Sequence, residues 1–311
     1  MTILLATDFA AAEQQRWLDL LQAALPAERF VTDAQAVAAA TIDIALVANP
    51  PPSALRGLAN LQLIQSLWAG VDQLLADTSL PADVTLARMV DPAMAAAMAE
   101  TALWAVLSVH RNYFHYGAQQ HARQWRPLPQ RRADEVAVAV LGLGEMGRSV
   151  ALRLAAQGYR VSGWSTRPTV LATVATHDGG SALRGVLAEA DIAINLLPLT
   201  AATRGLLCAR TFQVMPVGAS VVNLARGAHV VDADLLAALA SGQLHHAVLD
   251  VFHTEPLPTD HVFWHHPQVT LLPHAAALTD PHSACTVVAA NVQRLRHGVA
   301  LHAVVNRARG Y

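Results

Sequence analysis

Several segments in the last third of the chain place reactive side chains directly after apolar, strand-like runs. Arg226, Asp250 and His274 each follow such a run, and Glu255 lies shortly after Asp250. In a parallel sheet, residues that follow the carboxyl ends of strands face the ligand crevice. A planar guanidinium can grip a carboxylate through paired hydrogen bonds. A histidine titrates near neutral pH, and a neighbouring carboxylate favours its charged form. These residue types therefore suit acid-assisted chemistry on a small anion.

A glycine-rich turn between a strand-like and a helix-like segment predicts a dinucleotide site. Gly142-Leu-Gly144-Glu-Met-Gly147 matches the pattern G-x-G-x-x-G, with an apolar run before it and an amphipathic segment after it. In this fingerprint the first glycine makes a tight turn and the second lets the backbone approach a pyrophosphate. The third allows close helix–strand packing, and the helix N-terminus faces the negative charge. The context favours this interpretation over a glycine-rich turn that binds nothing.

The residues at the end of the next strand-like run predict which dinucleotide binds. NAD-binding domains of this type usually carry Asp or Glu there for the ribose 2′-hydroxyl. This chain instead has Trp164-Ser165-Thr166-Arg167, two hydroxyls and an arginine without a carboxylate. Such a group suits a 2′-phosphate, so we expect NADP(H). The alternative is that Arg167 is only a solvated surface charge.

Composition excludes several other mechanisms and partners. The sequence contains no lysine, which excludes Schiff-base, pyridoxal-phosphate and P-loop chemistry. The formal net charge of −2 offers no basic footprint, so we expect no nucleic-acid partner. Cys208 and Cys285 lie far apart and the histidines show no repeated ligand spacing, so we expect reduced thiols and no metal site.

The N-terminal segment predicts no targeting signal, because it lacks a basic region and its apolar run is short. The longest apolar stretch, between Ala93 and Val109, is interrupted by Glu100 and reads as a core or interface helix rather than a membrane span. We therefore expect a cytoplasmic protein without a membrane partner.

Alternating strand-like and helix-like segments predict a doubly wound α/β protein. At 311 residues the chain is long enough for about two domains. The polar stretch Gln119–Asp134 is predicted to be a loop. The expected strands are Ile3–Ala6, Asp43–Val47, Leu63–Ser66, Val84–Ala87, Val136–Leu141, Tyr159–Gly163, Asp191–Leu196, Ala219–Asn223, Ala247–Asp250 and Val269–Leu272. The expected helices are Ala11–Leu25, one from Pro92 past Arg111, Met146–Gln157, Asp232–Ala240 and one from Asp280-Pro281 to about His297.

At these motifs the chain resembles the D-isomer-specific 2-hydroxyacid dehydrogenase family over essentially its whole length. Within that family its motifs are similar to those of the glyoxylate/hydroxypyruvate reductase A branch. The stretches that carry the resemblance are Leu67-Trp-Ala-Gly-Val-Asp72, Asn195-Leu-Leu-Pro198, Asn223-Leu-Ala-Arg-Gly227, the Glu255 and His274 segments and Arg307-Ala-Arg-Gly-Tyr311.

The resemblance implies a role for each strand-end residue. Arg226 would bind the substrate carboxylate and polarise the 2-oxo group, His274 would donate a proton, and Glu255 would hold and charge His274. Asp250 would contact the nicotinamide end of the cofactor. Substrate contacts are expected at Trp68, Ala69, Gly70, Val71, Arg226 and His274. Cofactor contacts are expected at Gly142, Gly144, Glu145, Met146, Gly147, Ser165, Thr166, Arg167, Leu197, Pro198, Thr203, Ala225 and Asp250.

The resemblance also implies an architecture and an activity. We expect a flavodoxin-like substrate domain made of residues 1–97 and 283–311, and a Rossmann NADP-binding domain at 98–282, with a crevice between them that closes on binding. The implied activity is NADPH-dependent reduction of glyoxylate to glycolate and hydroxypyruvate to glycerate in a homodimer. A D-lactate or formate type of dehydrogenase, or a non-catalytic NADP(H)-sensing regulator, remains an alternative.

Overall fold

The computed structural model describes residues 1–311, which divide into two compact units. Unit 1 combines Met1–Ala93 with Thr279–Tyr311, and unit 2 is the continuous segment Met94–Leu278. The domain boundaries expected from the sequence lie four residues later at both joints (97 against 93, and 282 against 278). Each joint lies close to the first residue of a long helix, Pro92 in one case and Pro281 in the other.

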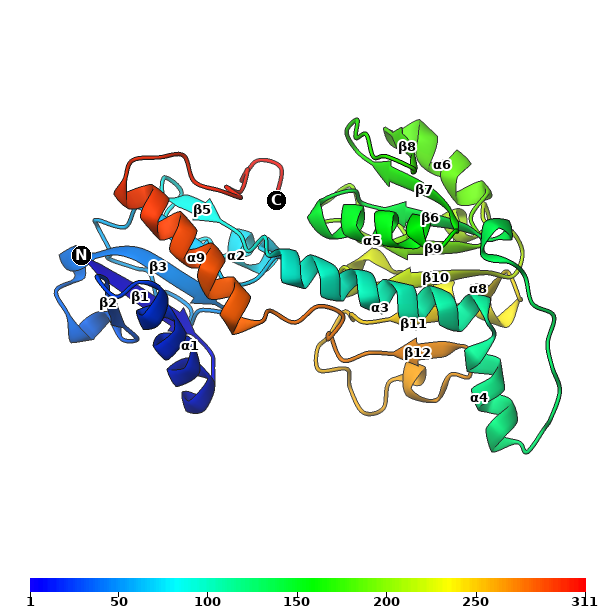
Figure 1. The fold of residues 1–311 in the computed structure, drawn as a ribbon. Helices are drawn as coiled ribbons and strands as arrows, with labels where there is room; N and C mark the ends of the chain where they lie inside the picture. The colour runs from blue at the N-terminus through cyan, green and yellow to red at the C-terminus, as the bar shows by residue number, and fades with distance from the viewer. The chain divides into compact units, whose positions relative to one another are not determined.

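Unit 1 is built on a five-stranded parallel sheet in the order β2-β1-β3-β4-β5. This is the flavodoxin-like strand order. Helices α1 and α9 pack against each other, although they come from opposite ends of the chain (Figure 1). The strands are β1 Thr2–Thr7, β2 Arg29–Val31, β3 Ile42–Ala48, β4 Leu63–Ser66 and β5 Thr85–Ala87. The helices are α1 Ala11–Ala24, α2 Asp72–Ala76 and α9 Pro281–Arg296, with single 3₁₀ turns at Ala34–Ala36 and Ala39–Thr41.

Polar contacts fasten α9 to the sheet of unit 1. The Arg296 guanidinium pairs with Glu28 at 2.7 Å and also with Asp43. The fully buried Asn291 donates to Gln65 Oε1 at 2.7 Å. The hydrogen bonds and the charge of Arg296 hold the pKa of Glu28 below its usual value. The C-terminal helix is therefore an integral part of unit 1.

Unit 2 is built on a seven-stranded parallel sheet in the order β12-β11-β10-β9-β6-β7-β8. Counted within the unit, this is the Rossmann order, and the chain reverses its direction of winding between β6 and β9. The strands are β6 Ala137–Leu141, β7 Arg160–Ser165, β8 Ala175–Asp178, β9 Ile192–Asn195, β10 Ala219–Asn223, β11 Leu244–Leu249 and β12 Val269–Leu271. The helices are α3 Pro92–His110, α4 Tyr113–His121, α5 Glu145–Ala156, α6 Gly180–Ala188, α7 Ala209–Phe212 and α8 Asp232–Ala240, with 3₁₀ turns at Ala133–Glu135, Gly227–His229 and Val262–His265.

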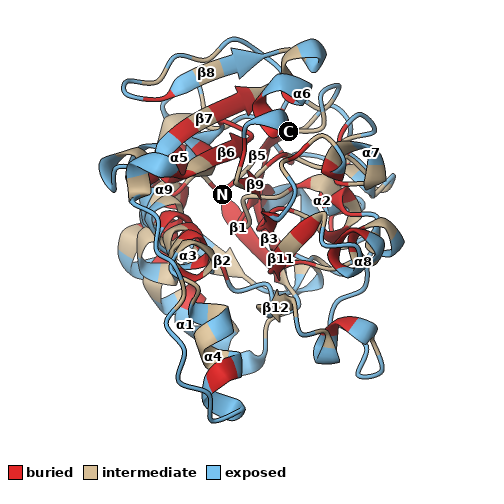
Figure 2. Ribbon diagram, turned by 90° about the vertical axis from the view of Figure 1, so that its right-hand side faces the viewer, coloured by how far each residue is buried: buried red, intermediate tan, exposed pale blue.

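The sheet of unit 2 is covered on both faces because successive residues of its strands point to opposite sides. In β10, Val221 packs in the cluster that contains α6, α7 and α8, while Val222 packs in the cluster that contains α3 and α5. The central strands of both units are buried (Figure 2). The two sheets confirm the prediction of two doubly wound α/β domains, one Rossmann and one flavodoxin-like.

Four local expectations were wrong. The helix expected to run from Pro92 past Arg111 ends at His110. The predicted loop Gln119–Asp134 begins inside a helix, because α4 runs from Tyr113 to His121. Strand β11 begins at Leu244 rather than Ala247, so it includes two histidines. The sequence analysis also missed the short edge strands β2 and β8, which lie at the margins of their sheets.

Helix α3 is long and apolar enough to cross a membrane by length and composition, a test that core helices of soluble proteins also pass. Ala102, Ala105 and Val106 are fully buried in the core of unit 2. Trp104, on the same helix, is 40% exposed. Part of α3 is thus core, as expected, and part remains apolar surface.

Candidate active site in unit 2

The four strand-end residues, Arg226, Asp250, Glu255 and His274, lie on three loops that follow neighbouring strands. The sheet order places β10, β11 and β12 side by side in parallel. Their carboxyl ends therefore share one edge of the sheet, where loops of this fold bind ligands. The structure brings Glu255, Asp250 and His274 into direct contact, and it places Arg226 on the adjoining loop.

His274 and Glu255 form a short side-chain pair. His274 Nδ1 lies 2.6 Å from Glu255 Oε2, while Glu255 Oε1 accepts a hydrogen bond from the Phe252 N–H at 2.9 Å. Each carboxylate oxygen thus has its own partner. The His274 side chain is 49% exposed. A ring held through Nδ1 leaves its Nε2 edge for a substrate, and the carboxylate stabilises a proton on the ring.

The loop that carries His274 is anchored by Asp250, whose side chain is buried. The two carboxylate oxygens accept the N–H groups of Ala275 at 2.7 Å and Ala276 at 3.1 Å, and the Asp250 carbonyl accepts the His274 N–H at 2.8 Å. His274 itself has a φ of 54°, a left-handed conformation that non-glycine residues seldom adopt. Burial raises the pKa of Asp250, and the two N–H bonds act in the opposite direction. The sequence analysis missed this anchoring role.

Two buried asparagines support the loop of Arg226. Asn195 Nδ2 donates to Asn223 Oδ1, and Asn223 Nδ2 donates to the Arg226 carbonyl, both at 2.9 Å. The Arg226 guanidinium donates to the Ala225 carbonyl at 2.7 Å. Asparagine at the last position of two neighbouring strands is a sequence signal that could have indicated this network. The backbone of Arg226 is therefore held at two successive strand ends.

The glycine fingerprint lies at the point where the chain reverses its winding. Gly142 has a φ of +99°, and a Cβ there would lie 2.7 Å from the Leu196 carbonyl oxygen. At Gly147 a Cβ would lie 1.7 Å from the Gly142 oxygen, so α5 packs directly on the turn. By contrast, a Cβ at Gly144 would face open space. The open backbone at Gly144, with the first turn of α5 behind it, fits a dinucleotide pyrophosphate.

The predicted ribose-phosphate residues follow β7 as expected. Ser165 is the last residue of β7, and its hydroxyl donates to the Arg167 carbonyl at 2.5 Å. Thr166 and Arg167 are exposed in the turn that follows. No carboxylate occupies these three positions, so the described turn would accept a phosphate without direct repulsion from its own side chains.

The remaining predicted cofactor residues lie at the ends of other strands and on α5. Leu197, Pro198 and Thr203 follow β9, and the buried Thr203 hydroxyl donates to the Pro198 carbonyl at 2.7 Å. This hydrogen bond lies within the loop after β9 and stabilises its conformation. Ala225 follows β10 and is buried, whereas Glu145 in the first turn of α5 is exposed and Met146 beside it is half-buried.

The predicted substrate residues of unit 1 form a turn after β4. The N–H of Trp68 donates to the Ser66 hydroxyl at 3.0 Å, and the Met89 N–H donates to the Trp68 carbonyl at 3.0 Å. The Trp68 ring packs edge-on against Phe9, with ring centroids 5.8 Å apart. Ala69, Gly70 and Val71 complete the turn and lead into α2.

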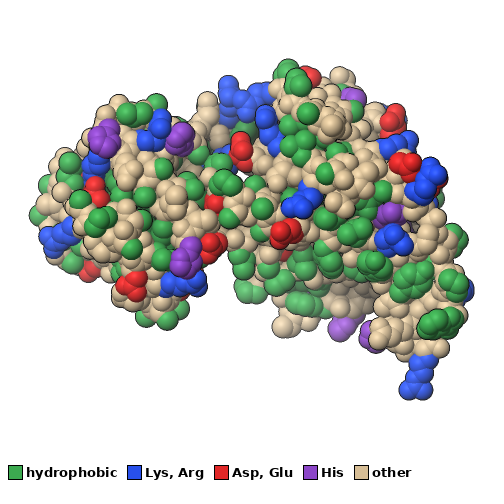
Figure 3. Space-filling view, in the orientation of Figure 1, with side chains coloured by type: hydrophobic (Ala, Val, Ile, Leu, Met, Phe, Trp, Pro, Cys, Tyr) green, Lys and Arg blue, Asp and Glu red, His purple; other side chains and the backbone are tan.

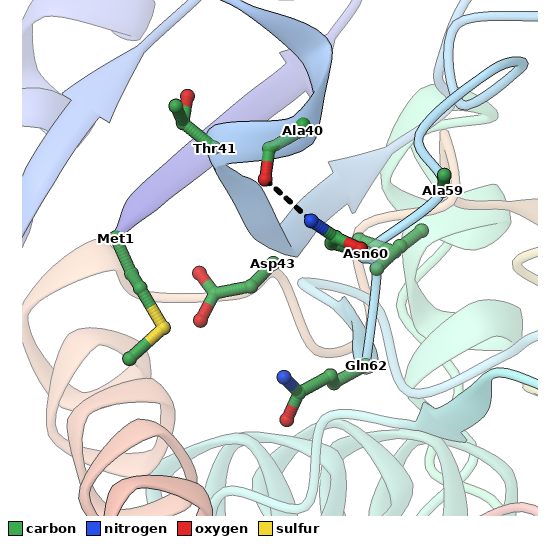
Figure 4. A pocket seen from close by; sticks show the side chains of 8 residues that line it. Met1, Ala40, Thr41, Asp43, Ala59, Asn60 and Gln62 are labelled. Carbon is green, nitrogen blue, oxygen red and sulfur yellow. Dashed lines mark hydrogen bonds between the residues drawn. The ribbon is translucent and has the colours of Figure 1, made fainter.

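A hollow of about 560 Å³ in unit 1 contains none of the predicted site residues. It lies at the amino end of β3, where Asp43 stands between the side chains of Met1 and Gln62 (Figure 4). Both Asp43 oxygens already bind Arg296. We assign no function to this hollow. No group of three or more His, Cys, Asp or Glu side chains in residues 1–311 could hold a metal ion.

Comparison with known proteins agrees with this geometry. The family model for the NAD binding domain of D-isomer specific 2-hydroxyacid dehydrogenases matches residues 103–276. The match spans more than half of the chain and includes every strand-end residue. The chain belongs to the D-isomer specific 2-hydroxyacid dehydrogenase family. The resemblance inferred from the sequence motifs is thereby confirmed.

Individual relatives match nearly the whole chain. A glyoxylate/hydroxypyruvate reductase A from Serratia proteamaculans is 42% identical over 274 residues, which cover 86% of this chain and 88% of the relative. A crystal structure of a D-isomer specific 2-hydroxyacid dehydrogenase from Xanthobacter autotrophicus with NADPH and MES is 37% identical, with a TM-score of 0.94 over 100% of this chain and 99% of that one. An NADPH-dependent glyoxylate/hydroxypyruvate reductase from Sinorhizobium meliloti with NADP and sulfate is 33% identical, with the same TM-score and coverage.

Proposed function

We propose that this dehydrogenase reduces small 2-oxo acids, such as glyoxylate and hydroxypyruvate, with NADPH. The observation that carries the proposal is the 2.6 Å contact between His274 Nδ1 and Glu255 Oε2, on a loop beside the one that holds Arg226. Such a pair orients the imidazole and lets it act as a general acid. The relatives from Serratia and Sinorhizobium, named for these two substrates, support the choice of substrate class.

In the proposed reaction each residue acts at a stated atom. The Arg226 guanidinium binds the substrate carboxylate and draws electron density toward the 2-oxo oxygen. When bound, NADPH supplies the hydride that the carbonyl carbon receives. The His274 Nε2–H gives its proton to the carbonyl oxygen, so the carbonyl becomes a hydroxyl group. Glu255 holds the ring by Nδ1 and stabilises its charge before the proton leaves.

We assign cofactor binding to the glycine turn and to the turn after β7. Gly142, Gly144 and Gly147 would admit the pyrophosphate, while Ser165 and Arg167 would bind the 2′-phosphate. NADPH and NADP in the Xanthobacter and Sinorhizobium crystal structures support this choice of cofactor. In unit 1, the turn after β4 stays a predicted binding site for a carboxylate through its backbone N–H groups.

We further propose that the protein acts in the cytoplasm as a homodimer, without a membrane or nucleic-acid partner. Hydrophobic side chains lie along α3 on the surface of unit 2 (Figure 3). Trp104 on this helix is 40% exposed, and Tyr113, just beyond it, is 56% exposed. An apolar surface of this kind is typical of a subunit interface. Light scattering after size-exclusion chromatography measures the oligomeric state.

The activity is tested by steady-state oxidation of NADPH with glyoxylate, hydroxypyruvate and pyruvate, and by reduction of NADP with formate. We expect turnover with the first two substrates that is lost in His274→Asn, a variant that keeps Nδ1-like hydrogen bonding without an acid at Nε2. Preference for pyruvate or formate would instead indicate one of the other dehydrogenase types. Tight NADPH binding without turnover of any substrate would indicate a sensor.

A further inference from the structure

The loop that carries Glu255 makes a polar contact with the start of α8, on a side away from His274. Asp232 is the first residue of α8, and its two carboxylate oxygens face two histidines. One oxygen lies 3.5 Å from His253 Nε2, and the other lies 3.8 Å from His261 Nε2. His253 Nε2 also lies 2.9 Å from the Val230 carbonyl, to which it donates. The His253 ring thus joins the Glu255 loop to Val230, which lies just before α8.

The hydrogen-bond partners indicate where the protons lie on these rings. His253 must carry a proton on Nε2 in order to donate to Val230. His261 Nδ1 accepts the Phe263 N–H at 3.3 Å, so the proton of the neutral ring is on Nε2 and is directed toward Asp232. The single Nε2–H of His253 is thus donated to Val230, while Asp232 lies 3.5 Å from the same nitrogen and faces the Nε2–H of His261.

The loops of Arg226 and Glu255 also touch directly. A Cβ at Gly227 would lie 2.0 Å from the carbonyl carbon of Phe252, so the two backbones meet without room for a side chain. The Phe252 N–H in turn donates to Glu255. A cavity of about 60 Å³ is lined by Asp232, His253, His261 and their neighbours in the loop. Phe252 and Leu257 pack against the apolar core of unit 2, and the polar contacts of His253 add to this packing.

We propose that His253, held by Asp232, is a positioning residue for the reduction. It fixes the Glu255 loop against the Arg226 loop, and this keeps the Glu255 carboxylate in contact with His274. The inference rests on the proposed role of that pair in the reaction. The side chain of His253 is 48% exposed, and such contacts add little to overall stability. Losing it should therefore displace the loop without unfolding the protein.

The test compares three variants. His253→Leu removes the donor at similar volume, His253→Gln keeps an N–H donor at a comparable reach, and His265→Leu changes an exposed histidine of the same region. NMR of ¹³C-labelled histidine follows the titration of His274, which is assigned with His274→Asn. This measurement does not depend on any substrate. Steady-state kinetics at saturating NADPH and a melting temperature complete the comparison.

For His253→Leu we expect the titration midpoint of His274 to fall measurably, because a displaced carboxylate favours the imidazolium less. Turnover should fall by roughly threefold to tenfold, since displacements near 1 Å cost up to about a hundredfold. The melting temperature and the KM for NADPH should stay close to wild type. His253→Gln should recover the midpoint, and His265→Leu should match wild type. Asp250 also faces His274 but is unchanged in these variants, so the shift reports on Glu255.

Two results would overturn the inference: an unchanged His274 midpoint in His253→Leu, or an equal change of that midpoint in the His265→Leu control. The proposed function fails in a different way. If the wild-type protein reduces no 2-oxo acid, the proposed activity is wrong. The His274 titration still decides whether His253 positions Glu255.

Discussion

Replacing Glu255 with Gln tests the proposed proton donor directly. Glu255 uses one oxygen for His274 and the other for the Phe252 N–H. Glutamine is nearly the same shape but has only one acceptor oxygen, so it can satisfy one of these donors and must present its NH₂ group to the other. The substitution therefore removes a charge and also forces a choice between two contacts.

The exposure of the His274 and Glu255 side chains sets how much activity the Glu255→Gln substitution should cost. At 2.6 Å, two unit charges attract by about 1.6 kcal/mol at the dielectric constant of water and by about 6 kcal/mol at an effective value of 20. The two side chains are 49% and 34% exposed, which favours the lower end of that range. A hydrogen bond to a charged group is worth about 1 kcal/mol more than a neutral one. Because about 1.36 kcal/mol corresponds to a tenfold change in rate, losing about 1 kcal/mol should lower kcat/KM by roughly fivefold.

The sign of the shift follows from the direction of the reaction. Reduction needs a protonated His274, so kcat/KM should fall as the pH rises. Without the carboxylate the charged ring is less favoured, so the fall in kcat/KM should move to lower pH. The assay is kcat/KM for glyoxylate at saturating NADPH between about pH 5.5 and 9, a range that brackets histidine titration. Glu189→Gln, at an exposed position after α6, is the control. A Glu255→Gln profile that superimposes on wild type would refute the pairing.

Three further predictions concern the neighbouring residues. Arg226→Ala should lower kcat/KM for glyoxylate by roughly a hundredfold or more with little change in NADPH affinity; wild-type turnover would refute its role. Arg167→Ala should weaken NADPH binding about tenfold while NADH binding is unaffected, and Ser165→Asp should shift the preference toward NADH. Equal kcat/KM for both cofactors in wild type would contradict the assignment of the 2′-phosphate site. Asp250→Asn can accept only one of two N–H groups and should lower kcat by about tenfold to a hundredfold as the His274 loop shifts. Its melting temperature should change little, because burial raises the pKa of Asp250 and its charge therefore costs stability at neutral pH; a large loss of stability at unchanged kcat would contradict this account.

Features encoded within a few neighbouring residues were predictable from the sequence. The glycine turn could be placed because its strand, its glycines and its helix follow one another directly. The strand-end residues could be placed together because the carboxyl ends of parallel strands share one edge. No such local pattern shows that the Asp250 carboxylate binds the N–H groups beyond His274, since these groups are distant in sequence.

Long-range contacts also explain why helix α4 and the start of strand β11 were missed. Helix α4 lacks a regular apolar stripe, and two of its rings stack on histidines of β11. Phe114 lies 4.2 Å from His246 and His115 lies 4.7 Å from His245, measured between ring centroids. Burial lowers the pKa of His246 to about 4, so this polar residue is neutral within a strand. A single set of ring contacts thus stabilises both the helix and the strand start that the sequence analysis missed.

The discontinuity of unit 1 sets an order for folding during synthesis. Unit 2 is one continuous segment, so all of its strands are available once residue 278 has left the ribosome. The sheet of unit 1 is made first, yet its packing partner α9 is made only after unit 2, and the contacts of Arg296 with Glu28 and Asp43 must wait for it. Domains generally fold as units during synthesis. The strands of unit 1 therefore emerge early, and the part of their sheet that α9 covers stays exposed until unit 2 has been made. Apolar surface exposed during such an interval is prone to aggregation.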